Sequence, residues 1–157
     1  MGWCGRLLLL ALVWLPGRSI GQVWEAARPF QEAFDNGVEL YRAEKYAVAQ
    51  AAFAEALAHA EPGVDLQRAD AAYFHAVCAA RLGRADAIFL LERFLDGYPE
   101  SLRANTARFE IAKLYYEQHG YQQAVAHFAQ LQRKAFTADV WAEIQFKKGY
   151  AHLQLNE

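Results

Sequence analysis

The chain has 157 residues, of which 55% are hydrophobic and 22% are charged. This composition is typical of a globular protein with ample core material, and it excludes an intrinsically disordered chain. The 16 basic and 18 acidic residues give a net charge of -2, so no electrostatic argument favours a nucleic acid as the partner. Alanine is abundant and proline is rare, which favours helix throughout.

Residues 1–21 have the three parts of a secretory signal peptide. Arg6 supplies positive charge, residues 7–15 (LLLLALVWL) form an apolar run, and Ser19 and Gly21 are small residues ahead of Gln22. The run is too short to span a bilayer, which needs roughly 20 apolar residues. We therefore expect export of the chain and cleavage before Gln22. An uncleaved N-terminal anchor is the alternative.

Helical periodicity predicts an all-α fold with no strand. A short lead-in covers residues 22–29 and precedes the first helix. The expected helices cover about 30–43, 46–60, 66–82, 85–96, 102–118 and 121–134, and a last one begins after Thr137. Their predicted N-caps are Asp65, Ser101 and Thr137, and glycines at 83 and 120 are expected to end two of them.

Small residues recur along the chain with a spacing of 36 to 39 residues, at Gly37, Ala76, Ala112 and Gly149. An aromatic residue stands three positions before each of them: Phe34, Tyr73, Phe109 and Phe146. An alanine and then a large apolar residue follow in three of the repeats, as Ala49 and Phe53, Ala87 and Leu91, and Ala124 and Phe128. The small residue would let a second helix approach closely, and the large one would fill the gap between neighbouring helix pairs.

These positions resemble the tetratricopeptide repeat (TPR) family. The first repeat matches the family pattern at Gly37, Tyr46, Ala49, Phe53, Ala56 and Pro62, and the third matches at Ala112, Tyr115, Gly120, Tyr121, Ala124 and Phe128. The resemblance implies a right-handed α-solenoid of antiparallel helix pairs, a TPR-like superhelix with about three and a half repeats. The repeats would cover about 30–63, 66–99, 101–134 and 138–157, with the last one incomplete.

Residues 91–101 and 109–128 are also similar to a narrower group of repeat proteins of the bacterial envelope. These are proteins of the outer-membrane assembly and Tol–Pal type, with a Bacteroidetes-like arrangement of signal and repeats. The resemblance implies a non-catalytic protein–protein interaction scaffold that is periplasmic or associated with the outer membrane. Its partner would be a protein segment held in the concave groove of the superhelix.

First helices line the groove in this family, so the register places a set of aromatic and basic residues there. The candidates are Phe34, Tyr41, Arg42, Tyr73, Arg81, Phe109, Lys113, Tyr116 and Tyr150. Aromatic residues and arginine are enriched at binding hot spots. The alternative for Phe34, Tyr73, Phe109 and Phe146 is packing between adjacent repeats.

No motif in the sequence indicates an enzyme, a metal site or a cofactor. The five histidines form no H-E-x-x-H pair, and no P-loop, G-x-S-x-G or dinucleotide fingerprint is present. Cys78 is the only cysteine beyond the leader and is expected in the core. The carboxylates Glu110, Glu117 and Glu143 are expected on solvated helix faces.

The last predicted helix has no partner helix, so it would offer an apolar face to water that consists of Trp141, Ile144, Phe146, Tyr150 and Leu153. The simplest hypothesis is that the chain is the N-terminal part of a longer protein. It would then be an accessory domain of a larger envelope protein or enzyme. A further alternative is self-association through this open helix, which Tyr150→Glu would abolish.

Overall fold

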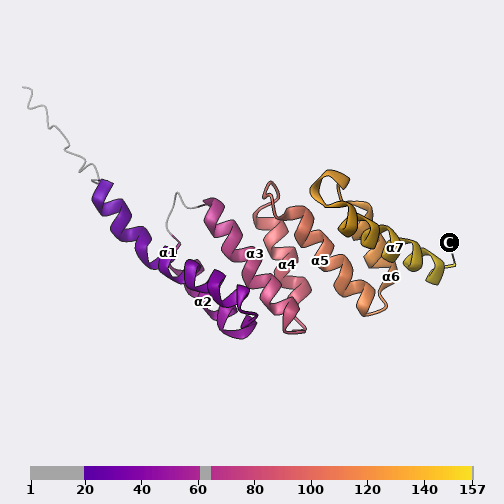
Figure 1. Cartoon of the computed structure of the whole chain (residues 1–157), viewed down its shortest axis with the longest axis horizontal. Coiled ribbons are helices and arrows are strands. Elements are labelled where there is room, and N and C mark those ends of the chain that lie inside the picture. The colour runs from indigo at the N-terminus through magenta and orange to yellow at the C-terminus, as the bar shows by residue number, and fades with distance from the viewer. Residues whose placement is uncertain (1–19, 61–64, 157) are drawn as a thin grey trace, which may run out of the picture.

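The computed structural model describes residues 20–60 and 65–156, and all regular structure in these ranges is helical (Figure 1). The helices are α1 (Ile20–Arg42), α2 (Tyr46–Ala58), α3 (Asp65–Arg81), α4 (Ala87–Gly97), α5 (Ala104–Glu117), α6 (Tyr121–Ala129), the 3-10 turn η1 (Arg133–Ala135) and α7 (Ala138–Gln154). The all-α prediction is confirmed for the described residues. The predicted signal peptide lies outside them except for its last two positions.

The first helix is longer than the sequence predicted. α1 begins at Ile20, ten residues earlier than expected, so the predicted lead-in at 22–29 belongs to a helix. Pro29 lies inside α1. Proline lacks an N–H group and is disfavoured in helix interiors, so its place inside α1 runs against its local preference.

Several other helix boundaries differ from the prediction, and one cap is confirmed. Asp65, a predicted cap, is the first residue of α3, and α4 begins at Ala87. Ser101 does not cap α5: its hydroxyl accepts a hydrogen bond from the Arg103 N–H (3.2 Å) in a turn before the helix. α6 ends at Ala129, and η1 replaces its predicted last turn. Thr137 caps α7 as predicted, because its hydroxyl accepts the Val140 N–H at 3.5 Å.

The same turn ends each odd-numbered helix. Its residue with positive φ is Glu44 (59°), Gly83 (65°), His119 (61°) or Asn156 (59°). Each of these stands seven residues after one of the recurring small residues. In each turn the N–H of this residue donates to the carbonyl three positions back, at 3.0 to 3.2 Å. In the third turn His119, and not the predicted Gly120, adopts the left-handed conformation. The preference of glycine for positive φ therefore did not predict the position of this residue in the turn.

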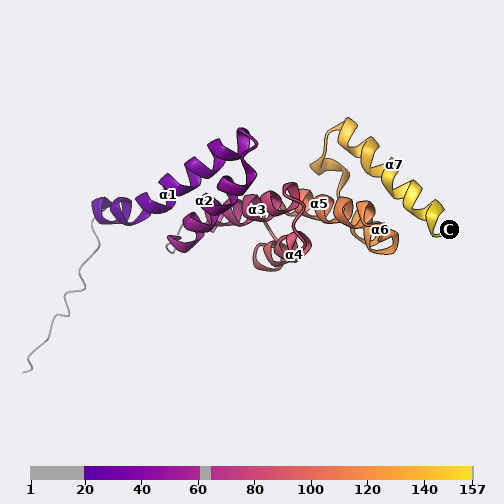
Figure 2. The ribbon, with the colours of Figure 1, turned by 90° about the horizontal axis from the view of Figure 1, so that it is seen from below.

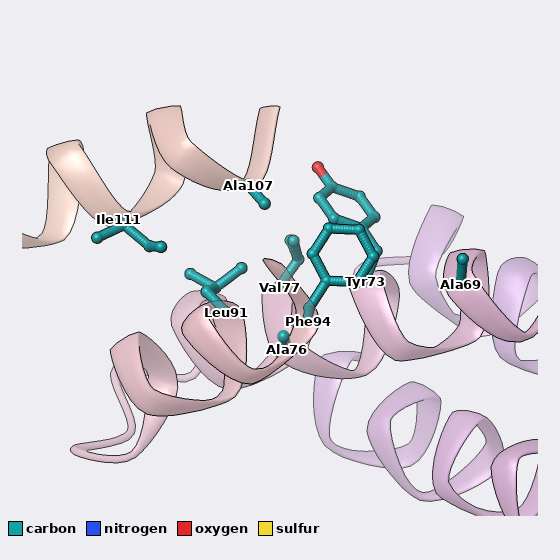
Figure 3. Packing of buried hydrophobic residues seen from close by; sticks show 8 residues of the cluster. All are labelled: Ala69, Tyr73, Ala76, Val77, Leu91, Phe94, Ala107 and Ile111. Atoms are coloured by element: carbon teal, nitrogen blue, oxygen red, sulfur yellow. The ribbon is translucent and has the colours of Figure 1, made fainter. Parts of the chain in front are cut away.

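The buried side chains form three clusters in succession along the chain. The first joins α1, α2 and α3 around Phe30 and Phe53. The second joins α3, α4 and α5 around Tyr73 and Leu91, as Figure 3 shows. The third joins α5, α6 and α7 around Phe128. α3 and α5 therefore contribute to two clusters each, and no single core unites the molecule.

The helices follow one another in chain order along the long axis, with α1 at one end and α7 at the other (Figure 1). Seen at right angles, α1 and α7 lie on one side of the middle helices and α4 on the other (Figure 2). Among the described residues, no helix is both long enough and apolar enough to cross a membrane.

Candidate functional site

One kind of contact recurs between successive odd-numbered helices. On each later helix, the contacting residue stands two positions before the recurring small residue. Its partner stands four or five positions after the small residue of the preceding odd-numbered helix. These contacts are Tyr41 with Phe74 (5.1 Å between ring centroids), Arg81 with Glu110 (3.0 Å between Nη2 and Oε1), and Tyr116 with Lys147 (4.9 Å from Nζ to the ring centroid). We call these six residues the interhelix row. Its chemistry changes along the chain from a tilted aromatic pair to an ion pair and then to a cation–π contact.

Glu110 is the centre of the row and was expected to be solvated. The structure corrects this, because Glu110 is only 7% exposed and receives two cations. Arg81 binds it at 3.0 Å, and the Nζ of Lys113 lies 3.6 Å from Oε2. A carboxylate at such a buried position needs paired charge around it. Two cations against one carboxylate leave this point of the surface with a net positive charge.

Arg81 links α1 to α5 through Tyr41 and Glu110. Burial lowers the pKa of Arg81, but the nearby Glu110 and Tyr41 more than offset this and raise it. Burial also raises the pKa of Tyr41, against the opposing effect of Arg81. Arg81 is therefore charged and Tyr41 is a neutral hydroxyl at physiological pH. The Arg81 side chain remains 35% exposed while both of its terminal nitrogens donate to Glu110.

Two of the predicted groove aromatics, Tyr73 and Phe109, are buried in the core, and a third, Phe34, is partly buried against it. Phe34 stacks on Phe30 and meets the edge of Phe53, each at 5.9 Å between centroids. Tyr73 and Phe109 are both buried, and burial is the main cause that raises the pKa of Tyr73. The packing alternative therefore describes Phe34, Tyr73 and Phe109 better than the groove does.

A second aromatic group joins α5, α6 and α7. Tyr116 meets Tyr121 at 5.8 Å and Tyr150 at 5.9 Å between ring centroids, and Tyr121 meets Tyr150 at 6.2 Å. Tyr150 is exposed and Tyr116 half-buried, so both present part of their rings at the surface. Arg42 is exposed near the end of α1 and takes no part in the contacts of the interhelix row.

Sequence reasoning missed Phe74, Glu110, Tyr121 and Lys147. Phe74, Glu110 and Lys147 share one position, two residues before the small one, and each meets the preceding helix. These contacts could have been predicted by comparing the residue two positions before each small residue with the residues at the end of the preceding odd-numbered helix. Tyr121 shows the same kind of signal, because it repeats the place of Tyr46, which meets Tyr41 at 5.5 Å.

Cys78 is fully buried, and burial raises the pKa of its thiol to about 11 against the opposing effect of Arg81. At pH 8 only on the order of one thiol in a thousand is then ionised. We expect Cys78 to resist a thiol-specific reagent at pH 8 in the folded chain and to react fully in denaturant. Peptide mass analysis after labelling measures this. Equal labelling of Cys78 in both states would contradict the burial.

The free energy of unfolding is expected to fall as the solution is acidified below about pH 6.5. Burial lowers the pKa of His127, with Glu92 opposing and Arg108 assisting, and its Nδ1 has no hydrogen-bond partner among the described residues. The unfolded chain binds the proton more readily than the folded chain. The contribution of neutral His127 to the free energy of unfolding is therefore fully present above the pKa that His127 has in the unfolded chain. This contribution is lost as the pH falls through the lower pKa that His127 has in the folded chain.

Urea midpoints at pH 7.5 and pH 5.0 test this effect. His127→Phe keeps the ring that stacks on Tyr115 (5.6 Å between centroids) and should reduce the loss at pH 5.0. The matched control is His119→Asn, because His119 is exposed and asparagine tolerates its positive φ of 61°. An undiminished acid loss in His127→Phe would show that His127 is not its source.

Within the described residues, no group of three or more histidine, cysteine, aspartate or glutamate side chains could hold a metal ion. Comparisons with protein-family models, curated proteins and solved structures find no match for the chain. The observations thus define a class by architecture: an all-α protein of consecutively packed helices with a row of polar and aromatic contacts between them.

Proposed function

We propose that the chain is a non-catalytic interaction scaffold of the TPR-like type, a right-handed α-solenoid that binds a segment of another protein. Three observations support the solenoid: the same turn at equal offsets from the small residues, three cores in succession, and one repeated contact between odd-numbered helices. Each helix pair buries part of its apolar surface only against the next pair, as in repeat proteins.

The single observation that carries the binding proposal is the group of Arg81, Glu110 and Lys113. It combines a net positive charge with a partly exposed Arg81 side chain, and the half-buried Tyr41 lies beside Arg81. The excess positive charge attracts a carboxylate, and the exposed part of a tyrosine ring gives apolar contact area. The ligand that fits is a protein segment with an acidic residue flanked by aromatic or aliphatic ones.

We further propose that the scaffold acts in the bacterial periplasm or at the outer membrane. The support is the leader pattern of residues 1–21 and the resemblance of residues 91–101 and 109–128 to envelope repeat proteins. The alternative is an accessory domain of a larger envelope protein or enzyme. Mass analysis of the chain recovered from a periplasmic extract tests the export step, because export with cleavage yields an N-terminus at Gln22.

Selection from a displayed peptide library tests the binding proposal. We expect the chain to enrich peptides that combine acidic and apolar residues, and Arg81→Gln to weaken the best of them by about 10-fold or more. Arg84→Gln is the matched control, because Arg84 pairs with Asp86 (2.9 Å) in the turn after α3 and lies outside the row. Unchanged binding by Arg81→Gln, or no enrichment at all, would refute this site.

A further inference from the structure

A hollow of about 340 Å³ lies between α2, α3 and α4, and we call it the α2–α4 pocket. Its apolar wall consists of one residue from α2, one from α3 and two from α4: Leu57, Ala72, Leu90 and Phe94. Phe74 and Arg81, the residues of α3 in the interhelix row, do not line it. Small-molecule sites have mainly apolar walls and volumes of roughly 300–1,000 Å³. The α2–α4 pocket therefore has the size and the lining of a site for a small organic molecule.

Two arginines also line the α2–α4 pocket, and no carboxylate does so among the described residues. Arg68 comes from α3 and Arg93 from α4, which lies on the side of the molecule away from α1 and α7 (Figure 2). One guanidinium nitrogen of Arg68 donates to the Ala60 carbonyl at 2.6 Å, which holds this side chain in place. Neither arginine forms an ion pair within residues 20–60 and 65–156. Two cations with no carboxylate between them give the pocket a positive potential, which attracts an anion.

Two other hollows of the described residues differ, because carboxylates accompany their cations. Arg84 lines a hollow of about 300 Å³ and binds Asp86, which lines it too, at 2.9 Å. Arg108 lines one of about 560 Å³ together with Glu92 and Asp96. The whole chain has 18 acidic and 16 basic residues, so basic residues without acidic ones depart from its average composition. The excess of positive charge is thus a local property of the α2–α4 pocket.

His75 lines the α2–α4 pocket as well and is half-buried. Burial is the main cause that lowers the pKa of His75; Arg84 and Arg93 act in the same direction, and Asp86 opposes them. His75 is therefore a neutral imidazole at physiological pH, with one N–H donor and one acceptor nitrogen. It adds a hydrogen-bond donor for an anion and no negative charge that would repel one.

We propose that the α2–α4 pocket binds a small carboxylate with an aliphatic body, of the size of a medium-chain fatty acid. The carboxylate binds Arg68 and Arg93, because hydrogen bonds between charged groups are stronger than those between neutral ones. The hydrocarbon packs on Leu57, Leu90 and Phe94, where it is removed from water. The proposal goes beyond the peptide scaffold, because neither the ligand nor any of these residues belongs to the Arg81 site.

Other ligands match only part of the α2–α4 pocket. An inorganic anion would use the two arginines and leave the apolar wall without a partner. A neutral alcohol would pack on the wall and leave both cations without a counter-charge. A folded protein segment is too large for a hollow of about 340 Å³. Only a ligand with one anionic end and one apolar end uses the whole lining.

Titration of the purified chain with octanoate, followed by amide chemical shifts in NMR spectra, tests the proposal. We expect a dissociation constant on the order of 100 µM, with the largest shift changes around the α2–α4 pocket. The control ligand is 1-octanol, which has the same carbon chain without the charge and is expected to bind about 10-fold more weakly or less tightly still. Equal binding of the two ligands, or shift changes centred on another part of the molecule, would overturn the proposal.

Two variants separate the charge from the cavity. Arg93→Gln is expected to weaken octanoate binding by about 5-fold or more and to leave 1-octanol binding unchanged. Ala72→Leu keeps both arginines but fills the cavity, so it is expected to weaken both ligands by about 10-fold.

The matched control is Arg42→Gln, which removes the same charge from an exposed site on α1. Circular dichroism checks the helix content of each variant. Arg81→Gln is expected to leave octanoate binding within about 2-fold, so failure of the peptide site and failure of this pocket are separate results. Octanoate binding that neither Arg93→Gln nor Ala72→Leu weakens, or that Arg42→Gln weakens as much, would show that the ligand does not occupy the α2–α4 pocket.

Discussion

Phe53→Ala is expected to lower the free energy of unfolding by about 3–5 kcal/mol. Phe53 is 0% exposed and stands at the centre of the first core cluster. Its ring lies 5.9 Å from that of Phe34 on α1 and 5.4 Å from that of Phe74 on α3. The substitution removes aromatic contacts with two helices at once and leaves a cavity that the close packing of α1 and α2 cannot fill.

Urea denaturation followed by circular dichroism measures this loss. The matched control is Phe89→Ala, which removes the same side chain from an exposed site where its ring lies 5.8 Å from the Arg93 guanidinium carbon. We expect the control to cost less than about 1 kcal/mol. Similar costs for the two variants would mean that Phe53 does not occupy the core in solution.

Gly37→Ala and Gly149→Ala are expected to change stability in opposite directions, although the two glycines hold equivalent places in the sequence pattern. At Gly37 the new methyl group would lie 2.7 Å from Cε1 and 2.9 Å from Cδ1 of the buried Phe53 ring. The ring has no room to move, so we expect a loss of about 1–3 kcal/mol. At Gly149 the methyl group meets no atom, and the better helix propensity of alanine should add about 0.5–1 kcal/mol.

Thermal and urea unfolding of both variants measure the two shifts, with all samples at the same low protein concentration. The double variant Gly37→Ala with Phe53→Leu provides a further check. Leucine is smaller than the ring, so the two substitutions should be less destabilising together than the sum of their separate effects. A Gly37→Ala variant as stable as the original would show that α1 and α2 do not approach as closely as the structure places them.

The helices were largely predictable because their periodicity is local. The small residues at 37, 76 and 112 and the large residues Phe53, Leu91 and Phe128 proved to be buried where their spacing placed them. Local chemistry failed where a residue departs from its usual preference. Pro29 lies inside α1, and His119 rather than the neighbouring glycine takes the positive φ. In both cases the observed conformation departs from the intrinsic preference of the residue.

The candidate site was predictable only in part. Tyr41, Arg81, Lys113 and Tyr116 could be placed on one side of their helices from the register alone. The partner of Arg81 could not, because Glu110 stands 29 residues further along the chain. Which residues meet across two helix pairs depends on how far one pair is displaced relative to the next, and a single helix pattern does not contain that displacement. For the same reason the pattern could not tell that Phe146 is exposed while Phe109 is buried.

The division of the interior into three successive clusters bears on how the chain acquires its structure. Each cluster joins only helices that are consecutive in the chain, so its contacts close short loops, and low contact order of this kind goes with folding in microseconds to milliseconds. The clusters are connected through the two helices they share, α3 and α5, and through Tyr41 of α1, which packs against both the first and the second cluster. Local unfolding of α1 or α7 is therefore expected to disrupt mainly the cluster at its own end of the molecule. Unfolding of α3 or α5 is expected to disrupt two clusters at once.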